Sequence, residues 1–570
     1  MSALTADAAY PRSFVVPSSS DSHDAYLSEP PIRKLAEFFQ RKGLAALKEE
    51  DQHEQWYEDW IAYQAEHRIY ASVLAPGQFD VLRYARFLEV FGYFSPAHGY
   101  SAQVTFLGLF AVLMGENAAL KQEAAATLQS GGLFAFGVSE KTHGSDLLAG
   151  EFIVKQLDDG RFIANGSKYY IGNSNAASII AILAKREEGG NRRVPFVLFA
   201  LRPASSKGYH NRRKIRTLGV RGGYVGEFEV HDHQFPPADI IAEGRGAWDA
   251  VLGTVTLGKF FLGFGSIGIC EHAFEEAHAH LKSRILYGKP TIEMPHIRAA
   301  MTQAFTRLTA MKLYAYRALD YLHAAHAGDR RYLLFCAVQK AKVSTEGVKT
   351  MALMSECVGA KGFESDTWFE MALRDIQLIP GLESSAHINL GLTALFCGRY
   401  FDRFDTDLPD PKSLVAGETP SAPNEFLTSA RTGAINSIAF APAMKAYEPL
   451  AGIANVRLFA RQIERFQSFL AANPTIDAAD TQSSLAVGQC MAIIAYGQLI
   501  AEAAHRLGVA AETVAAIFHL LIADLSAAAL NLAALPRIDA RARSRARRMV
   551  TVPKTAQADW DSVARQMDIP

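Results

Sequence analysis

The sequence of 570 residues has few cysteines and no sign of a secretory leader. Its five cysteines are scattered, with no CxxC pair and no regular spacing, and this pattern favours free thiols in a reducing compartment. The first residues, MSALTADAAYPRSFVV, lack the basic start and the continuous apolar run of a secretory signal. We therefore expect a soluble, cytoplasmic protein.

The sequence also lacks an excess of charge of either sign. Its 58 Lys and Arg residues balance 59 Asp and Glu residues, so the formal net charge is -1. This balance predicts no global attraction to nucleic acid or to an anionic membrane, and we expect no nucleic-acid partner. A local exception is the basic stretch RIDARARSRARRM, Arg537 to Met549. Its first interpretation is a solvated helix face or the end of a helix bundle; a membrane surface, an anionic carrier protein and nucleic acid are alternatives.

Even the most hydrophobic part of the chain contains ionisable residues. The stretch VAAIFHLLIADLSAAALNLAAL carries His519 and Asp524 in its middle. Ionisable groups are expensive in the hydrocarbon core of a bilayer. We therefore interpret this stretch as a buried helix of a bundle and expect no transmembrane segment.

Several catalytic signatures are absent as well. The sequence has no GxxxxGK[ST], HExxH or GxSxG. It therefore lacks the motifs that are typical of phosphate-loop hydrolases, zinc peptidases and acyl-transfer enzymes with a nucleophile elbow. GFGSIG, at Gly263 to Gly268, matches GxGxxG but lies inside a long helical pattern rather than after a strand, which favours close helix packing. His231, Asp232 and His233 are interpreted as an exposed strand edge, and no metal site is expected.

The pattern along the chain divides it into five parts. Residues 1–30 form an irregular leader, and residues 31–130 have apolar residues at helical spacing. Residues 131–245 alternate like strands, with Asp-Gly and Asn-Gly as hairpin signals. Long helices return over residues 246–400, and residues 401–570 comprise a linker and an additional helical domain. The sequence therefore predicts a mainly α protein with a β-rich middle domain.

Four stretches carry residues suited to binding a flat or phosphorylated ligand. In FAFGVSEKTHGSD (134–146) a strand enters a loop of small residues, whose N–H groups and hydroxyl can cradle phosphate oxygens or a heterocycle. NGSKYYIGN (165–173) adds two aromatic residues, and SRILYGKP (283–290) adds an Arg before a turn. SECVGAKGFESDTWFEMALRD (355–375) ends in an Arg-Asp pair just before Glu383, a carboxylate among small residues.

In this order and at this spacing, the four stretches resemble the acyl-CoA dehydrogenase and acyl-CoA oxidase superfamily of flavoproteins. The resemblance covers roughly residues 35 to 400. It implies an N-terminal helical domain, a middle β-barrel-like domain and a C-terminal four-helix bundle. The additional C-terminal helical domain is similar to those of acyl-CoA oxidases and very-long-chain dehydrogenases. FAD is the implied cofactor.

The resemblance assigns cofactor roles to individual positions. Ser145 would approach the flavin pyrophosphate or the thioester, Tyr170 would pack on the isoalloxazine, and Arg284 would reach the FAD of a neighbouring subunit. Gly359 falls in a glycine turn that also contacts the partner's cofactor. The implied cofactor-binding residues are Phe136, Val138, Ser139, Gly144, Ser145, Tyr170, Gly172, Arg284, Gly359, Ser385 and His387. The implied substrate-binding residues are Ser145, Lys259 and Leu382.

Glu383 is the implied catalytic base, because it lies nine residues after Arg374, as the family's glutamate does after its arginine. The α-proton of a saturated thioester is weakly acidic, and a carboxylate in an apolar site has its pKa raised towards working pH. The family's Tyr-Glu-Gly-Thr is Leu-Glu-Ser-Ser here, from Leu382 to Ser385. A purely structural alternative for Glu383 is a carboxylate at the start of the following helix.

The resemblance implies an FAD-dependent acyl-CoA dehydrogenase of fatty acid metabolism that forms a trans-2-enoyl thioester. Glu383 would remove the α-proton, and flavin N5 would take the β-hydride. Substrates would be acyl-CoA or acyl carrier protein thioesters, the electron acceptor an electron-transfer flavoprotein, and the assembly a homodimer or tetramer. Gly172 resembles the oxidase branch, so an oxidase that reduces dioxygen to hydrogen peroxide is an alternative. A catalytically silent member that binds DNA or a protein partner through Arg537–Arg548 is a second alternative.

Overall fold

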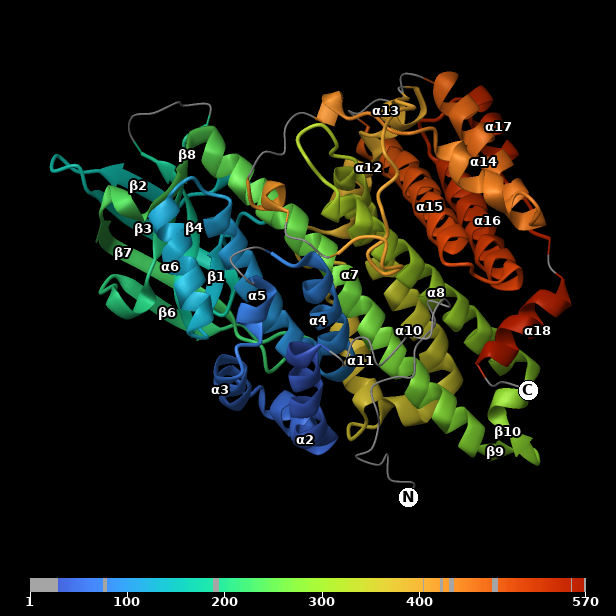
Figure 1. Cartoon of the computed structure of the whole chain (residues 1–570), viewed down its shortest axis with the longest axis horizontal. Helices are drawn as coiled ribbons and strands as arrows, with labels where there is room; N and C mark the ends of the chain where they lie inside the picture. Colours follow the sequence, from blue (N-terminus) through green and yellow to red (C-terminus); the bar gives the residue numbers. More distant parts are fainter. Residues whose placement is uncertain are drawn as a thin grey trace. The chain divides into compact units, whose positions relative to one another are not determined.

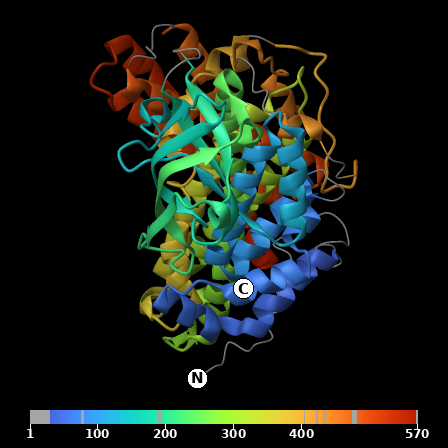
Figure 2. The same ribbon diagram turned by 90° about the vertical axis from the view of Figure 1, so that its left-hand side faces the viewer.

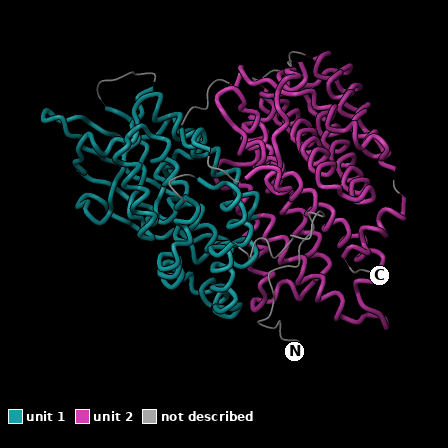
Figure 3. Tube along the Cα trace, in the orientation of Figure 1, with its two compact units in different colours: residues 1–8, 26–265, 421–433 teal, residues 9–25, 266–420, 434–570 magenta. Residues whose placement is uncertain are grey.

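The computed structural model describes residues 29–74, 79–187, 194–402, 404–420, 424–429, 435–473, 480–554 and 556–567. Of these residues, 29–265 and 424–429 form one compact unit, and 266–420 and 435–567 form a second (Figure 3). All but the last two residues of the expected leader, 1–30, lie outside the described residues.

The first unit begins with helices, as the apolar spacing predicted. Asp80 and Asn117 cap two of them by accepting hydrogen bonds from the backbone N–H groups of Arg83 and Leu120. The helix over residues 96–113 is buried on nearly all sides and packs on the sheet (Figures 1 and 2). The helices are α2 (Pro30–His53), α3 (Glu58–Glu66), η1 (Tyr70–Leu74), α4 (Val81–Phe94), α5 (Pro96–Leu113) and α6 (Ala118–Gln129).

The described strands of the first unit form one mixed sheet in the order β6-β7-β3-β2-β4-β5-β8, with β1 parallel to β4. Its core consists of alternate inward side chains such as Phe152, Phe162 and Phe228. The strands are β1 (Leu133–Gly137), β2 (Ile153–Gln156), β3 (Phe162–Gly172), β4 (Ala177–Arg186), β5 (Phe196–Leu201), β6 (Tyr209–Lys214), β7 (Val225–Phe235) and β8 (Ile240–Glu243). Short 3₁₀ turns are η2 (Leu147–Ala149), η3 (Pro203–Ser205) and η4 (Pro237–Asp239).

The two turn signals in this region have different outcomes. Asp159-Gly160 forms the predicted hairpin turn between β2 and β3, with Gly160 at φ +84°. The prediction for Asn165-Gly166 was wrong, because this pair lies inside β3 at a shift of register against β7. Gly166 has φ +151°, and a Cβ there would lie 2.6 Å from the Phe152 ring. The glycine is needed for a bulge and a close contact, which local sequence does not distinguish from a turn.

GFGSIG lies within the long helix α7 (Gly244–Ser283), as its helical context predicted. A Cβ at Gly92 of α4 would collide with the backbone carbonyl of Gly265. This contact between two glycines lets α4 and α7 approach closely within the first unit. The boundary between the two units falls inside α7, after Gly265.

The second unit is helical apart from a small hairpin. Its hairpin strands are β9 (Ile285–Leu286) and β10 (Lys289–Pro290). The helices up to residue 402 are η5 (Thr291–Glu293), α8 (Pro295–His323), α9 (Tyr332–Val338), a π-helical turn η6 (Gln339–Val343), α10 (Ser344–Val358), η7 (Gly359–Phe363), α11 (Trp368–Ile376), α12 (Ala386–Ala394) and α13 (Cys397–Asp402). The later ones are η8 (Glu425–Thr428, in the first unit), η9 (Ile435–Ser437), η10 (Ala443–Leu450), α14 (Ala454–Ala471), α15 (Thr481–Arg506), α16 (Ala511–Ala534), α17 (Ala540–Arg548) and α18 (Gln557–Gln566).

The additional C-terminal helices pack directly on the earlier ones of this unit. Helix α15 packs on α8 and α12, and a Cβ at Gly488 would collide with the Leu390 carbonyl of α12. α15 and α16 run side by side (Figure 1). Because α12 follows the loop that carries Glu383, the packing of α15 on α12 also holds the end of that loop.

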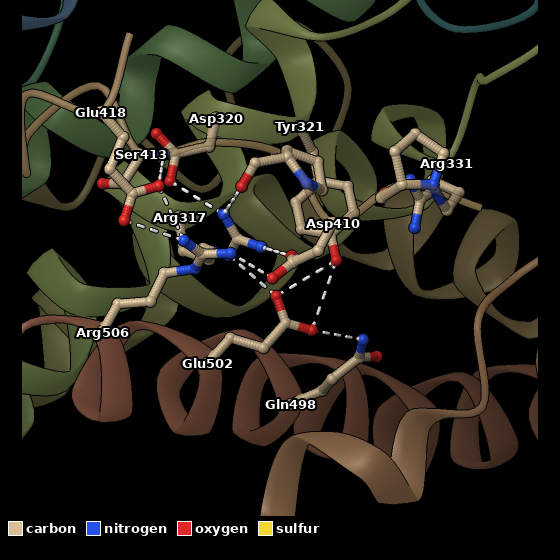
Figure 4. Close-up of polar contacts among 12 residues, drawn as sticks. Arg317, Asp320, Tyr321, Arg331, Asp410, Ser413, Glu418, Gln498, Glu502 and Arg506 are labelled. Atoms are coloured by element: carbon tan, nitrogen blue, oxygen red, sulfur yellow. Dashed lines mark hydrogen bonds and ion pairs between the residues drawn. The ribbon is translucent and has the colours of Figure 1, made fainter. Parts of the chain in front are cut away.

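The expected linker is held by the network of ion pairs shown in Figure 4. Arg317 of α8 is 1% exposed; it donates to Glu502 of α15 at 2.8 Å, to Asp320 at 3.1 Å and to the Pro411 carbonyl at 2.6 Å, and pairs with Asp410. Asp410 and Pro411 of the linker are therefore bonded to Arg317 of α8, which also bonds α15.

Asp524, which argued against a membrane span, is paired inside the second unit. It accepts hydrogen bonds from Lys342 at 2.8 Å and from Arg307 at 3.2 Å. By length and composition, α7, α15 and α16 could each cross a membrane; 78%, 78% and 61% of their most apolar windows are buried in the protein. The absence of a transmembrane segment stays a prediction.

The basic stretch from Arg537 to Met549 contains α17. Asp539 caps the helix, and Arg543 donates to the Ala533 carbonyl at the end of α16 at 3.0 Å. One arginine of the stretch therefore has a structural role, while others, such as Arg541, are exposed.

Candidate active site

Glu383 lies in a tight loop between α11 and α12. Glu383 and Ser384 have φ values of +54° and +81°, which non-glycine residues rarely adopt. The loop is closed by hydrogen bonds from the backbone N–H of Ala386 to the Pro380 carbonyl and of Gly381 to the Leu378 carbonyl, both 2.9 Å. Such strain persists only where the surrounding structure imposes it, and it is concentrated at functional sites.

The residue that caps α12 is Ser385 and not Glu383. The Ser385 hydroxyl accepts a hydrogen bond from the Ile388 N–H at 3.4 Å. Asn389 donates to the Ser384 hydroxyl and to the Ser385 carbonyl, both at 2.9 Å. Glu383 therefore does not cap α12, although it lies two residues before the cap, and a carboxylate at the start of this helix stays an alternative.

The electrostatic surroundings of Glu383 suit a base. Burial raises the pKa of the Glu383 carboxyl to about 7, and the charge of Lys340 acts in the opposite direction. Lys340, in η6, is fully buried and donates a hydrogen bond to the Ile379 carbonyl of the same loop. A carboxyl with a pKa near 7 is poised to take up or release a proton at neutral pH.

In the first unit, the loop after β1 is held by a buried ion pair. Lys168 of β3 lies 2.9 Å from Glu140 and also donates to the Val138 carbonyl at 3.0 Å. Glu140 accepts hydrogen bonds from the N–H groups of Glu151 and Phe152. Burial lowers the pKa of Lys168 to about 8, while burial of Glu140 is outweighed by Lys168 and the N–H donors, so the pKa of Glu140 is lowered.

The start of the loop that is predicted to bind the cofactor is also held by hydrogen bonds of Ser139. Ser139 donates to the Tyr169 carbonyl at 2.7 Å, and the Tyr169 N–H donates to the Ser139 carbonyl at 2.9 Å. Beyond Glu140, Gly144 and Ser145 are exposed, and nothing lies within 4 Å of a Cβ placed on Gly144. The loop thus offers a free hydroxyl and an open backbone beside a rigid strand pair.

Tyr170 lies at a bulge in β3. The register against β7 shifts between Tyr169 and Ile171, and Tyr170 has φ +63°. Its side chain is 60% exposed, with its ring 4.5 Å from the Tyr169 ring. Bulges redirect side chains and are frequent beside active sites. The bulge directs an aromatic ring outwards, as stacking on a flat ligand requires.

Gly172 is buried, and side chains of α5 occupy the place of its missing side chain. A Cβ at Gly172 would lie 2.6 Å from Val104 and 2.8 Å from the Tyr100 hydroxyl. The glycine therefore opens no space on this side. The next residue, Asn173, has φ +59° and donates to the carbonyls of Ser101 and Phe134, which ties β3 to α5 and β1.

The remaining predicted residues are distributed over both units. In the first unit Phe136 and Val138 are half-buried and Lys259 is buried on α7. In the second unit Leu382 is half-buried beside Glu383, while His387 and Arg284 are exposed. Gly359 has φ +67° and lines a hollow of about 580 Å³ formed by α10, η7 and α11. The structure thus gathers Phe136, Val138, Ser139, Tyr170 and Gly172 in one unit and Leu382, Glu383, Ser385 and His387 in the other.

No group of three or more His, Cys, Asp or Glu residues is placed to share a metal within the part of the chain that the structure describes. His231 bonds Glu229 at 2.9 Å, and His233 bonds the Ser206 hydroxyl at 2.9 Å.

Sequence reasoning missed three residues that shape these sites: Lys168, Asn173 and Lys340. Lys168 and Asn173 stand in a stretch that was already singled out, but their partners lie 28 and 72 residues away. Lys340 lies in a helical pattern, and the only local sign was a lysine among apolar residues. Long-range partners of this kind leave no periodic signal.

Two family models match the chain in the expected order. The model "Acyl-CoA dehydrogenase, middle domain" matches residues 135–233, and "Acyl-CoA dehydrogenase, C-terminal domain" matches residues 244–391. Cyclohex-1-ene-1-carbonyl-CoA dehydrogenase from Syntrophus aciditrophicus is 24% identical over 52% of this chain and 71% of its own length. The protein of the same name from Geobacter metallireducens is 25% identical over 43% of this chain, and the match spans 63% of its length.

The fold has close counterparts among solved structures. An acyl-CoA dehydrogenase complexed with FAD from Bacillus anthracis has a TM-score of 0.74 at 14% identity, over 94% of this chain and 93% of that chain. Because this match extends over nearly the whole chain, the fold that includes the additional C-terminal helices also occurs in another protein. The matched models identify residues 135–233 and 244–391 as domains of the acyl-CoA dehydrogenase superfamily, and the chain has the fold of that superfamily.

Proposed function

We propose that this protein is an FAD-dependent acyl-CoA dehydrogenase with Glu383 as the base that removes the α-proton. The observation that carries the proposal is the position of Glu383: a carboxyl with a pKa of about 7, in a strained loop, with helix capping left to Ser385. The two relatives named cyclohex-1-ene-1-carbonyl-CoA dehydrogenase support the reaction class.

The residues of the first unit fit a flavin. The exposed Tyr170 ring offers a face for stacking, and the exposed Ser145 hydroxyl and the open Gly144 backbone suit a pyrophosphate. The related fold from Bacillus anthracis was solved with FAD. When bound, FAD accepts the hydride that leaves the β-carbon of the thioester.

The chain's own part in the reaction is to bind, orient and move one proton. Glu383 in its carboxylate form takes the α-proton, and a pKa near 7 keeps that form available at neutral pH without making the carboxyl a weak base. The backbone hydrogen bonds of the loop fix the backbone from which the Glu383 side chain extends, which limits the reorganisation needed when the proton moves. Leu382 provides an apolar neighbour that excludes water.

The finer assignments belong to the same proposal. The substrate is an acyl thioester of coenzyme A or of a carrier protein, the electron acceptor is an electron-transfer flavoprotein, and the enzyme works in the cytoplasm as a homodimer or tetramer in fatty acid metabolism. The filled space beside Gly172 favours the dehydrogenase over the oxidase, because that glycine creates no opening towards α5.

The test uses the purified protein reconstituted with FAD. Anaerobic mixing with a panel of acyl-CoAs should bleach the flavin absorbance, and Glu383→Gln should slow bleaching by at least ~100-fold while FAD content is unchanged. Glu448→Gln, which alters an exposed carboxylate of η10, is the matched control and should react at the unaltered rate. Equal rates for Glu383→Gln and the control would sink the proposed role of the base.

Two alternatives have distinct outcomes in the same preparation. An oxidase would release stoichiometric hydrogen peroxide when the substrate-reduced protein meets air, without another acceptor. A silent binding protein would show no bleaching by any thioester and salt-dependent retention on DNA through exposed arginines such as Arg541.

A further inference from the structure

Lys340 is a fully buried lysine whose side chain reaches the loop of the proposed base. It lies in the π-helical turn η6, between α9 and α10. Its ammonium donates a hydrogen bond to the carbonyl of Ile379, which precedes Glu383 by four residues in the same loop. A π-helical turn inserts an extra residue in a helix and is frequent at functional sites. The inserted residue changes the direction in which the side chains of this segment project.

The neighbouring lysine, Lys342, belongs to a different group of charges. It bonds Glu346 and Asp524, both at 2.8 Å, and Arg307 joins the same cluster. Two lysines only two residues apart thus serve different partners. Lys340 is bonded to the loop of Glu383, whereas Lys342 helps to fix α16 against α8 and α10.

Other charged groups on the elements packed around η6 have partners of their own. Lys312 of α8 bonds Glu271 at 2.6 Å, and Glu502 of α15 bonds Arg317 at 2.8 Å. Lys349 of α10 bonds Glu346 at 3.0 Å and is half exposed, and His387 of α12 is exposed. A buried ammonium is costly unless it is hydrogen-bonded and compensated by negative charge. The Glu383 carboxylate is the acidic group of the loop that Lys340 holds, and the charge of Lys340 acts on it.

We propose that Lys340 is a positioning residue for the base: its ammonium anchors the loop through the Ile379 carbonyl and places a positive charge where it stabilises the Glu383 carboxylate. This inference rests on the proposed function. One buried side chain then controls both the geometry of the loop and the protonation state of the Glu383 carboxyl.

Burial and the charge of Lys340 have opposite effects on the pKa of the Glu383 carboxyl. Burial favours the neutral carboxyl and raises the pKa of Glu383, whereas the charge of Lys340 lowers it. The lysine restores part of the carboxylate population. The charge of Lys340 lowers the pKa of the Glu383 carboxyl, and a nearby opposite charge lowers a carboxyl pKa by about one to three units in general. Removing the charge should therefore move the acid limb of the rate profile to higher pH.

The experiment compares Lys340→Met, which keeps length but removes charge, with Lys340→Arg, which keeps the charge. Lys349→Met is the matched control, because it removes a lysine of the adjacent helix that is 52% exposed. For each holoenzyme, kcat/KM is measured between pH 5.5 and 9.5 by anaerobic flavin bleaching, a range chosen to span about two units around neutrality. FAD content and the thermal midpoint establish that each variant is folded.

The expected result is a shift of the acid limb by about one unit or more in Lys340→Met, with the rate at high pH largely retained. At pH 7 a one-unit shift from a pKa of about 7 would make this variant react about fivefold more slowly. Lys340→Arg should restore most of the rate at pH 7, and Lys349→Met should follow the unaltered profile. If kcat/KM of Lys340→Met fell by the same factor at every pH, with the acid limb unchanged, the lysine would have a structural role only and the proposal would be overturned. A profile identical to that of the unaltered protein would overturn it as well.

A second readout does not depend on turnover. Infrared difference titration, with Glu383→Gln as the reference, reports the protonation of the Glu383 carboxyl directly. Lys340→Met should raise its midpoint, and an unchanged midpoint overturns the inference. If no thioester bleaches the flavin, the proposed function fails, while this titration still decides whether Lys340 stabilises the carboxylate. If Lys340→Met does not fold, Lys340→Gln takes its place in both measurements.

Discussion

The Lys168 ammonium lies 2.9 Å from the Glu140 carboxylate, and the pair joins the middle of β3 to the loop that follows β1. Both side chains are buried, so neither can exchange its partner for water. The loop carries Ser139 and leads to Ser145, two predicted cofactor residues. The geometry of the loop that is proposed to bind the flavin therefore depends on a buried ion pair.

Lys168→Met should lower the free energy of unfolding by about 3–5 kcal/mol, because it leaves the Glu140 carboxylate buried without its cation. FAD retention should fall in parallel as the loop loses its anchor. Denaturant unfolding and FAD content measure the two effects. Lys155→Met, at an exposed position of β2, serves as the control. Combining Lys168→Met with Glu140→Gln should recover part of the loss; no recovery would contradict this account of the pair.

Glu383→Gln should stabilise the protein above pH 7. The folded-state pKa of Glu383 is raised from 4.5 to about 7, so the folded protein keeps a proton that the unfolded chain releases between these values. Stability therefore declines as pH rises through this window, and above pH 7 the full penalty is present. Removing the ionisable group should add about 1–3 kcal/mol at pH 8 and nothing at pH 4.

Thermal unfolding of the Glu383→Gln variant and of the unaltered protein at both pH values checks this prediction. Glu448→Gln again serves as the exposed control. An equal change in thermal midpoint at pH 4 and pH 8 would show that the substitution acts through packing and not through ionisation.

Arg317→Met should destabilise the second unit by about 3–5 kcal/mol, because Asp320, Asp410 and Glu502 would face one another without their shared cation (Figure 4). Burial raises the pKa of Asp320 to about 7, and Arg317 opposes this effect, so the variant should take up a further proton near neutrality. Limited proteolysis of the segment 404–420 and denaturant unfolding report the change. Arg541→Met, at an exposed position, should change stability by less than about 1 kcal/mol.

Gly172→Ala should cost about 1–3 kcal/mol of stability, because the new methyl group would overlap Val104 and the Tyr100 hydroxyl. Val104→Ala in the same chain should recover much of this loss by making room. Denaturant unfolding of the single and double variants measures the loss of stability and its recovery. If Gly172→Ala were neutral and instead slowed the reaction of reduced flavin with dioxygen, the glycine would be an opening to the flavin, and the oxidase assignment would gain support.

Much of the fold follows from the sequence pattern. Helical spacing, the strand-like segments of residues 131–245 and the helical context of GFGSIG all agree with the structure, because burial of one face imposes a period that is visible locally. Asn165-Gly166 was misassigned because a glycine at a bulge and a glycine at a turn have the same local signature. The superfamily and the position of Glu383 also follow from motif order and spacing.

The sequence by itself determined the element types, the superfamily and the identity of the proposed base. Only the tertiary structure decided what surrounds that base. It shows that Ser385 caps α12, that Lys340 reaches the loop of Glu383 and that side chains of α5 fill the space beside Gly172. These relationships join residues up to 72 positions apart, as at Asn173 and Ser101. Contacts between distant segments form only when the chain packs, so they leave no period or motif in the sequence from which they could be inferred.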